Sequence, residues 1–343
     1  MRRLAALAVG TMAGFAFAWM NTPIPWMLGP LVAIAGLRIA GLDIAAPPGA
    51  REAGQWIIGV ALGLYFTPAV MRHIADVWYL PLAAAAFSIV VGYASGAVLA
   101  RLAKLDLTTS LFASVPGGAM EMSALGERFG ARVDKVAAGQ SMRMLLVVAI
   151  VPALFTLAGV RGSDAYAMGT VLFDAAGFAK LMGAALIGAL VAERVGIPNA
   201  FVIGALLVSI PLTAAQIHLS SMPALVSNTG QVLLGCALAS RFQPDFLRGA
   251  PRFIGGVVAS VLVSIVLASA FGLFLAWAGG QNAATMILGM APGGVAEMAI
   301  TAKVLQLGVP LVTAFHVMRL VVLLMLTGPV YERARRFRRS RRD

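Results

Sequence analysis

The sequence predicts an all-α integral membrane protein, with about ten transmembrane helices, two re-entrant helical hairpins and two inverted-topology repeats. Three observations support this prediction: an apolar composition, a series of long apolar segments and a motif that occurs twice. Of the 343 residues, 60% are hydrophobic and 12% are charged, and the mean hydropathy is +0.90. A water-soluble globular protein could not hide so much apolar surface, so the lipid bilayer is the expected environment.

Ten apolar segments account for the predicted spans. Most reach the roughly 20 residues that a helix needs to cross about 30 Å of hydrocarbon. Strands of a membrane barrel would instead alternate in polarity over about 10 residues, and these segments do not. The first segment follows two arginines, as in a signal peptide, but Asn21-Thr22-Pro23 is a poor cleavage site and we keep the segment as a helix. The segments are residues 4–20, 24–41, 53–71, 78–100, 136–160, 174–192, 197–217, 224–240, 253–278 and 307–330.

The motif PGG-x-x-E-M marks an internal duplication. It occupies residues 116–122 and 292–298, so its copies are 176 residues apart (292 minus 116). The same offset pairs Gly54-Gln55 with Gly230-Gln231, and Met142-Arg143 with Met318-Arg319. One ungapped register over residues 54–143 predicts a tandem duplication. We therefore divide the chain into a first membrane repeat (1–160), a second membrane repeat (161–332) and a basic cytoplasmic tail (333–343).

Positive charges set the predicted orientation of the repeats. Arginines crowd residues 333–343, directly after the last span, where they fit anionic lipid head groups rather than a nucleic acid. If residues 107–127 and 283–302 are re-entrant hairpins, most basic connections fall on the same side as this tail, as the positive-inside rule expects. Arg72 and Arg161 are exceptions. The pattern predicts inverted repeats with both termini in the cytoplasm.

Each motif places a helix breaker inside apolar sequence. Proline lacks an N–H donor and glycine permits turns, so each motif should end one half-helix and begin another, whose N-terminus attracts anions. Discontinuous helices of inverted repeats form the midplane substrate sites of secondary transporters. The predicted substrate-binding residues are therefore Pro116, Gly117, Gly118, Glu121 and Arg143 in the first repeat, and Pro292, Gly293, Gly294, Glu297 and Arg319 in the second.

Two alternatives stay open for the charged members of this set. Glu121 and Glu297 lie three residues after the second glycine, where a carboxylate either caps the free N–H groups of its own helix or binds sodium or a proton. Arg143 and Arg319 follow these glutamates by 22 residues (143 minus 121; 319 minus 297). They either pair with the glutamates or hold an anionic substrate, because an unpaired buried arginine is costly.

Five polar residues on the same elements are secondary candidates for binding: Gln55, Thr109, Gln231, Thr285 and His316. In membrane helices such side chains more often bond to neighbouring helices. His316 and Gln140 occupy equivalent positions one turn before the two arginines. No metal site is predicted, since the three histidines lack ligand spacing. Because no nucleotide-binding loop or catalytic triad is evident, we expect no enzyme activity and no cofactor beyond a coupling Na⁺ or H⁺.

The duplicated pattern resembles a known family. VPGGAMEMSALGERFGA in one half and APGGVAEMAITAKVLQLGVP in the other, each followed by an apolar helix containing Met-Arg, resemble the membrane AbrB family. That family is a duplicated bacterial inner-membrane group, which has also been labelled as ammonia monooxygenases and, through a shared name, as transcriptional regulators. The resemblance implies a bacterial inner-membrane location. The general plan is also similar to that of glutamate/sodium and citrate symporters, which is an architectural analogy.

Two functions from different classes follow as expectations. The first is an ion-coupled secondary transporter of a small organic anion, working by alternating access of the elevator type. The second is a membrane-embedded sensor or regulator that affects gene expression indirectly, without transport. The expected partners are an anionic solute and the lipid bilayer, with a homodimer as the candidate assembly and no nucleic acid.

Overall fold

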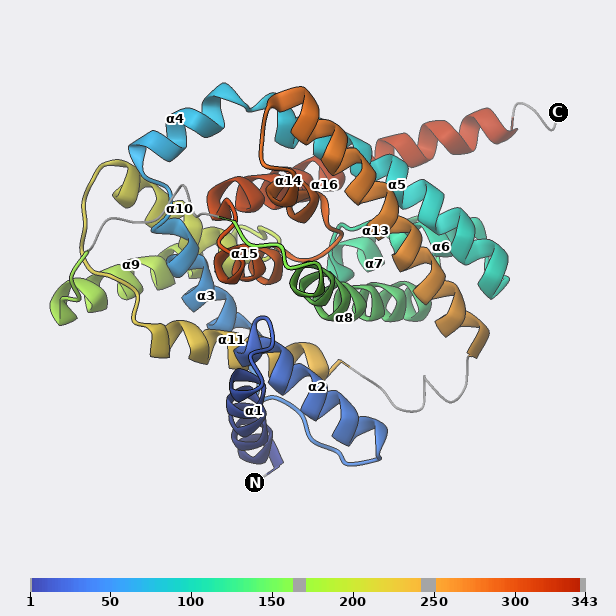
Figure 1. The fold of residues 1–343 in the computed structure, drawn as a ribbon. Helices are drawn as coiled ribbons and strands as arrows, with labels where there is room; N and C mark the ends of the chain where they lie inside the picture. The colour runs from blue at the N-terminus through green and yellow to red at the C-terminus, as the bar shows by residue number, and fades with distance from the viewer. Residues whose placement is uncertain (1, 163–170, 242–250, 340–343) are drawn as a thin grey trace. The chain divides into compact units, whose positions relative to one another are not determined.

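The computed structural model describes residues 2–162, 171–241 and 251–339 of the chain. Every regular element within these ranges is an α-helix (Figure 1). Together with the apolar composition, this confirms the predicted all-α membrane class. The extreme C-terminal residues of the predicted basic tail, 340–343, lie outside the described residues.

Five helices are long and apolar enough to cross a bilayer individually. They are α5 (Tyr79–Ala103), α8 (Val133–Leu157), α9 (Ala175–Arg194), α13 (Pro251–Gly279) and α16 (Val309–Arg339). Four apolar helices are shorter: α1 (Arg2–Trp19), α2 (Pro25–Ile39), α10 (Ala200–Ala214) and α11 (Ala224–Ala239). Each of the ten predicted segments therefore contains a helix, while the number that cross the bilayer ranges from five to six by length and composition in the described residues.

The segment expected at 53–71 is not one straight helix. It divides into α3 (Ala50–Gly63) and α4 (Pro68–Asp76), which meet at an angle of 90°. Pro68 explains the division, because proline has no N–H for the helical ladder and its ring disfavours helical geometry at Thr67. The segment predicted as one of the ten spans is therefore a bent pair of helices, which forms either a broken span or a re-entrant loop.

α16 continues past the predicted start of the basic tail. Its 31 residues run to Arg339, a length of about 46 Å at about 1.5 Å per residue. This exceeds the roughly 30 Å of hydrocarbon, so the arginine-rich end of the helix can lie beyond the apolar layer.

The chain forms two compact units, and neither matches one repeat. Unit 1 comprises Met1–Asp76, Val148–Gly249 and Val295–Thr313, and unit 2 comprises Val77–Val147, Ala250–Gly294 and Ala314–Asp343. Each unit thus takes segments from both halves of the sequence. The boundaries pass through α8 and α16.

Helix ends follow the sequence register in both halves. In the first half α6 (Leu107–Ser114) and α7 (Ala119–Arg128) flank the motif, and in the second α14 (Ala283–Met290) and α15 (Val295–Val304) do so. The starts of these helices differ by the same 176 residues (283 minus 107; 295 minus 119). The two motifs therefore interrupt equivalent pairs of short helices.

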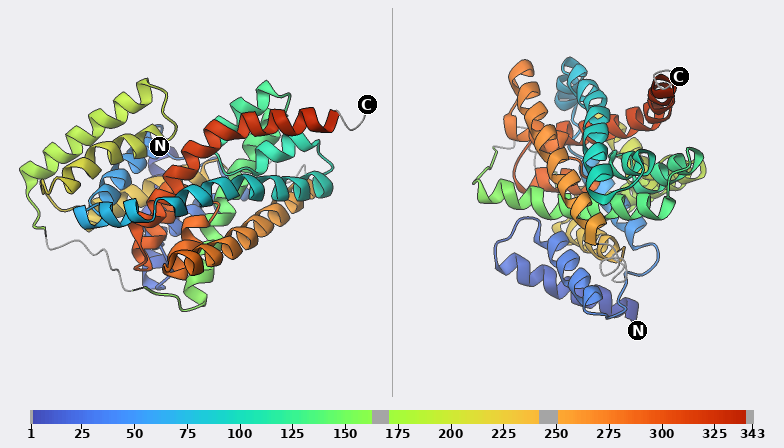
Figure 2. Two further views of the ribbon diagram at one scale, coloured as in Figure 1. Left: turned by 90° about the horizontal axis from the view of Figure 1, so that it is seen from above. Right: turned by 90° about the vertical axis from the view of Figure 1, so that its right-hand side faces the viewer.

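Unit 2 is built around two long helices, α5 and α13, which pack side by side (Figure 2). α6 packs on α5 and α14 packs on α13. Equivalent glycines allow these close approaches: a Cβ at Gly96 would lie 3.0 Å from Leu111 Cα, and a Cβ at Gly272 would lie 2.9 Å from Ile287 Cα. Small residues at such positions let membrane helices approach closely. The long helices thereby hold both short arms that lead into the motifs.

Unit 1 contains a similar close contact between α9 and α10. A Cβ on Gly204 would lie 2.5 Å from both Ala189 Cα and Gly188 O, which are backbone atoms that cannot turn aside. We expect Gly204→Ala to lower the free energy of unfolding by about 1–3 kcal/mol, as other overpacked substitutions do. The measurement is thermal unfolding of the detergent-purified protein, followed by tryptophan fluorescence.

Gly183→Ala is the matched control for this prediction. Gly183 lies on α9, and a methyl group added there would meet nothing within 4 Å, so alanine should be neutral or stabilising by up to roughly 1 kcal/mol through helix propensity. Equal unfolding temperatures for the two variants would contradict the close packing of α9 on α10.

Candidate functional site

The first interruption lies between α6 and α7. Asp106 caps the start of α6 by accepting a hydrogen bond from Thr109 N at 2.8 Å. The helix ends at Ser114, and Val115 turns extended with φ −61° and ψ 128°. Gly118 then adopts φ 94° and ψ 145°, a conformation that favours glycine, and α7 begins at the next residue. The first N–H groups of α7 lack partners within their own helix.

The second interruption repeats this geometry. Asn282 accepts a hydrogen bond from Thr285 N at 3.0 Å, in the position of Asp106. Ala291 is extended with φ −52° and ψ 136°, and Gly293 N donates to Ala291 O at 2.8 Å. Gly117 N donates to Val115 O at the same distance in the first half. Both three-residue tips, 116–118 and 292–294, lie in unit 2.

Two side chains of α8 hold the carboxyl end of α6. Arg143 Nη1 donates to Val115 O at 2.9 Å and to Ser114 O at 3.3 Å. Gln140 Nε2 donates to Phe112 O and to Val115 O, each at 2.7 Å. Last-turn carbonyls have no partner within their helix and carry partial negative charge, so a buried guanidinium is favourable there. Arg143 is thus paired with backbone oxygen.

Two side chains of α16 hold the carboxyl end of α14 in the same way. Arg319 donates to Ala291 O at 2.6 Å and also to Gly293 O. Arg319 Nη2 lies 2.7 Å from His316 Nδ1, and His316 Nε2 lies 3.3 Å from Leu288 O. Because a guanidinium can only donate, Nδ1 must accept and Nε2 must carry the hydrogen. His316 is therefore a neutral imidazole in this arrangement.

The two supports are equivalent by position and by partner. Gln140 and His316 both bond to the carbonyl three residues before the extended residue, and Arg143 and Arg319 both bond to the carbonyl of the extended residue itself. Both arginines belong to unit 2 and both are buried. Each tip therefore has a positive charge in apolar surroundings, which would favour an anion.

The carboxylates differ between the two halves. Glu121 is half-buried, and its carboxylate folds back over Gly118, where any side chain would overlap it. Glu297 is 9% exposed, and its backbone carbonyl accepts a hydrogen bond from Thr301. Within the described part of the chain, no ion pair joins Arg143 to Glu121. Backbone carbonyls have taken the place of the carboxylate partner considered for Arg143.

Comparison with known proteins gives the family. The family model described as "Transition state regulatory protein AbrB" matches residues 26–335. The chain belongs to the AbrB family. This confirms the resemblance seen in the duplicated motif, which falls within the matched residues in both copies.

Two curated relatives are similar over nearly their whole length. "Uncharacterized protein YhjN" of Bacillus subtilis (strain 168) is 27% identical, covering 95% of this chain and 91% of the relative. "Putative regulator AbrB" of Escherichia coli (strain K12) is 24% identical, covering 92% of this chain and 91% of the relative. The similarity of this AbrB-family chain therefore extends over nearly the full length of both relatives and is not confined to one domain.

The secondary candidates of this AbrB-family chain do not all gather at the tips. Thr109 accepts a hydrogen bond from Arg132 N at 2.9 Å, and Thr285 N bonds to Asn282. Both threonines therefore lie at the N-terminal ends of α6 and α14, away from the tips. Gln55 donates to Asn199 at 3.3 Å and Gln231 donates to Asn228 at 3.4 Å, within unit 1. Of the five, His316 alone contacts a tip arginine in the described structure.

Gln140 was missing from the predicted set, although it makes two bonds at the first tip. Its signal was present in the repeat register, since it lies opposite His316 one turn before the arginine. A glutamine in an apolar helix is not by itself informative, because membrane helices use amides for ordinary packing. Its partnership with the carbonyls of α6 appears only in three dimensions.

Proposed function

We propose that the protein is a secondary transporter of a small organic anion, coupled to a sodium or proton gradient. The observation that carries this proposal is the repeated pairing of a buried arginine with the carbonyl end of one half-helix, directly before a glycine tip that opens the next. Positive charge, partnerless N–H groups and irregular backbone are the elements from which midplane substrate sites of transporters are made.

Alternating access of the elevator type fits the organisation of the chain. An elevator mechanism needs two bodies, of which one carries the site past the other. Here each compact unit draws on both halves of the duplication, and both tips with both arginines belong to unit 2. We infer that unit 2 is the part that carries the solute.

The proposed setting is the inner membrane of a bacterium, with both termini in the cytoplasm. The multi-pass character rests on the apolar helices, and the orientation rests on the arginine-rich end of α16 and the positive-inside rule. These arginines would lie among anionic lipid head groups.

Flux through reconstituted protein tests the proposal. Proteoliposomes on a solid-supported membrane would receive concentration jumps of mono- and dicarboxylates, with and without a sodium or proton gradient. We expect transient currents for at least one carboxylate and larger currents with the coupling gradient. Absence of both current and uptake of a radiolabelled carboxylate, with protein verified as folded and inserted, would contradict transport. Uptake is included because one monocarboxylate moving with one proton or sodium ion carries no net charge.

The two motif carboxylates are the proposed coupling groups. We expect Glu121→Gln combined with Glu297→Gln to reduce the increase in current caused by the gradient by at least about tenfold. The reason is that amides neither bind protons nor carry the charge that attracts sodium. The measurement is carboxylate-driven current with and without the gradient. Glu127→Gln, an exposed carboxylate on the same helix α7 as Glu121, is the control and should keep the response. Unchanged coupling in the double variant would assign the glutamates to helix capping instead.

The alternative is a membrane-embedded regulator that binds a solute without moving it. What favours it is the name of the E. coli relative, which describes that protein as a regulator, and the description of the family model. Specific binding of a carboxylate to the purified protein, together with absence of flux, would favour this function over transport.

A further inference from the structure

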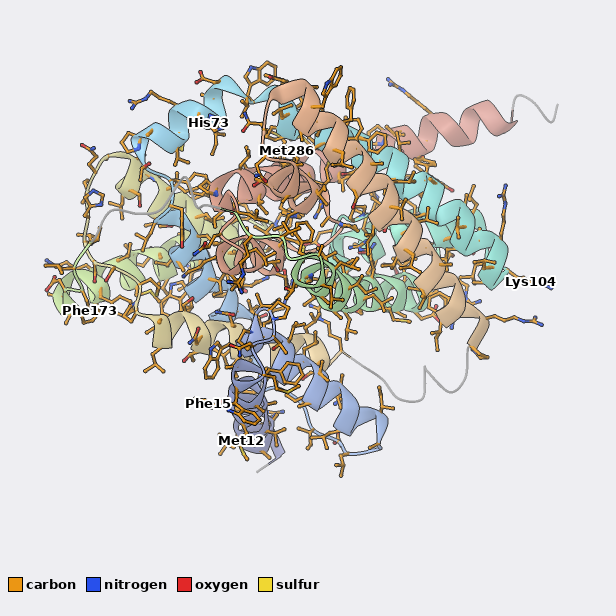
Figure 3. The ribbon with its side chains drawn as sticks, in the orientation of Figure 1. Met12, Phe15, His73, Lys104, Phe173 and Met286 are labelled. Atoms are coloured by element: carbon orange, nitrogen blue, oxygen red, sulfur yellow. The ribbon has the colours of Figure 1, made fainter. Side chains whose placement is uncertain are left out.

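The two tips share the extended residue and the turn that follows it, but they differ in polarity. The 176-residue offset pairs Ser110 with Met286, Ser114 with Met290 and Ser123 with Ala299. Figure 3 shows Met286 on α14, and this side chain is fully buried. The first half therefore carries three hydroxyl groups at positions where the second half is apolar.

The polar side chains beside the second tip, His316 and Arg319, satisfy one another, whereas the partnerless Gln231 Oε1 and Thr327 Oγ1 belong to other parts of the second half. Both ring nitrogens of His316 have partners, and the guanidinium of Arg319 reaches two carbonyls and the imidazole. Buried polar groups that are fully paired stiffen a site and leave no donor or acceptor for a ligand. The side chains of His316 and Arg319 at the second tip are thus occupied by contacts within the protein.

The first half keeps buried polar atoms that have no partner among the described residues. Three of them are Ser110 Oγ, Gln140 Oε1 and Arg143 Nε. Ser110 and Gln140 are fully buried and Arg143 is 4% exposed. Such atoms are costly in an apolar interior, and native proteins satisfy them with ordered water or with a ligand.

Two of these atoms, Gln140 Oε1 and Arg143 Nε, belong to one small region. Gln140 and Arg143 both bond to Val115 O, so the amide oxygen and the Nε–H at the ends of the two side chains lie beside the same carbonyl. Ser110 lies one turn before Ser114 on α6, and Ser114 O is another partner of Arg143. The region adjoins the tip whose N–H groups open α7.

We propose that the ligand is recognised at the first tip alone, and that it is a small carboxylate that also carries a neutral O–H or N–H donor. The carboxylate would accept hydrogen bonds from Arg143 Nε and from the N-terminus of α7. The donor would satisfy Gln140 Oε1, which no carboxylate oxygen can do, and the Ser110 hydroxyl can serve either part. This specificity rests on the proposed function for its role in transport, but binding can be measured without it.

Four probes of similar size test the required donor: lactate, pyruvate and propionate have three carbons, and oxamate has two carbons and an amide nitrogen. Lactate offers an O–H and oxamate an N–H, whereas pyruvate offers only an acceptor and propionate offers neither. Malate, oxaloacetate and succinate repeat the comparison at four carbons. The full-length protein in detergent would be titrated with each probe at constant ionic strength, and the shift of its unfolding temperature would be recorded.

The expected result is that lactate and oxamate, or malate at four carbons, bind at least about tenfold more tightly than the probes without a donor. Gln140→His should abolish this preference, because the equivalent His316 uses its donor on the α14 carbonyl and its acceptor on Arg319, so a histidine paired in the same way with Arg143 would leave no acceptor for the ligand. Ser110→Ala should weaken binding. Ser88→Ala is the control, since that hydroxyl bonds to a carbonyl of its own helix, α5.

Several results would overturn the inference. Equal shifts for probes with and without a donor would mean that Gln140 Oε1 takes no part in recognition, and no shift with any carboxylate would mean that no such ligand binds. A preference that survives Gln140→His would place recognition elsewhere. The transport proposal stands or falls separately: selective binding without flux would leave this inference intact, whereas flux without selectivity would leave transport intact and end the inference.

Discussion

Replacing Arg319 by methionine is expected to destabilise the protein more than any other single change at the tips. The substitution leaves two backbone carbonyls and one imidazole nitrogen without a donor in an apolar interior. Stranding one partner of a buried polar contact costs about 1–3 kcal/mol, so we expect a loss of roughly 3 kcal/mol or more and a fall in unfolding temperature of about 5 °C or more. Thermal unfolding in detergent measures this.

Two further variants show whether the lost hydrogen bonds are responsible. Arg319→Lys keeps the charge but presents fewer donors in a different geometry, so its unfolding temperature should lie between those of the wild type and the methionine variant. Arg101→Met, at the exposed last turn of α5, removes an arginine from the surface and should change little. A methionine variant at 319 that is as stable as Arg101→Met would contradict the backbone-holding role.

Gly118→Ala is expected to abolish transport. Gly118 has φ 94°, which L residues rarely adopt, and an added methyl group would overlap the carboxylate of Glu121. Backbone strain of this kind costs about 1–3 kcal/mol, and relief of the overlap would move the carboxylate away from the tip. We expect at least about a hundredfold loss of carboxylate-driven current, since small misplacements at a binding site have effects of this order.

Gly130→Ala is the matched control for this change. Gly130 also has a positive φ, of 79°, but nothing lies within 4 Å of an added Cβ. It should lose some stability and keep its current. Combining Gly118→Ala with Glu121→Ala separates the two causes: recovery of the unfolding temperature would assign the damage to the overlap, and no recovery would assign it to the backbone. Full current in Gly118→Ala would show that the shape of the tip is unimportant.

Much of this fold could be predicted because a membrane protein needs long apolar helices, which are visible in the composition and in the repeated segments of the sequence. The apolar segments, the repeat and the helix breaks follow from hydrophobicity, from an ungapped register and from proline. The caps Asp106 and Asn282 bond as their positions next to helix starts suggest. The division between α3 and α4 was missed because the segment is mostly apolar on both sides of the break, although Pro68 was the signal for it.

The partners of the charged residues could not be predicted. The sequence places Arg143 and Arg319 at a fixed spacing from glutamates and left pairing with them open. The structure pairs both arginines with carbonyls at the ends of half-helices instead. A broken helix creates such carbonyls, but which side chain reaches them depends on how a distant helix packs. Likewise, only the structure shows that Gln140 Oε1 and Arg143 Nε are buried without a hydrogen-bond partner among the described residues.

By itself the sequence determined the membrane class, the duplication and the helix breaks at the two motifs, since hydrophobic runs and proline act locally along the chain. Only the tertiary structure decided that the compact units mix the two halves, that arginines hold the ends of the arms, and that the first tip retains unsatisfied donors and an acceptor where the second does not. The physical reason is that the partner of a buried hydrogen-bonding or charged group is whichever group packs against it. Residues far apart in the sequence come into contact only through tertiary packing.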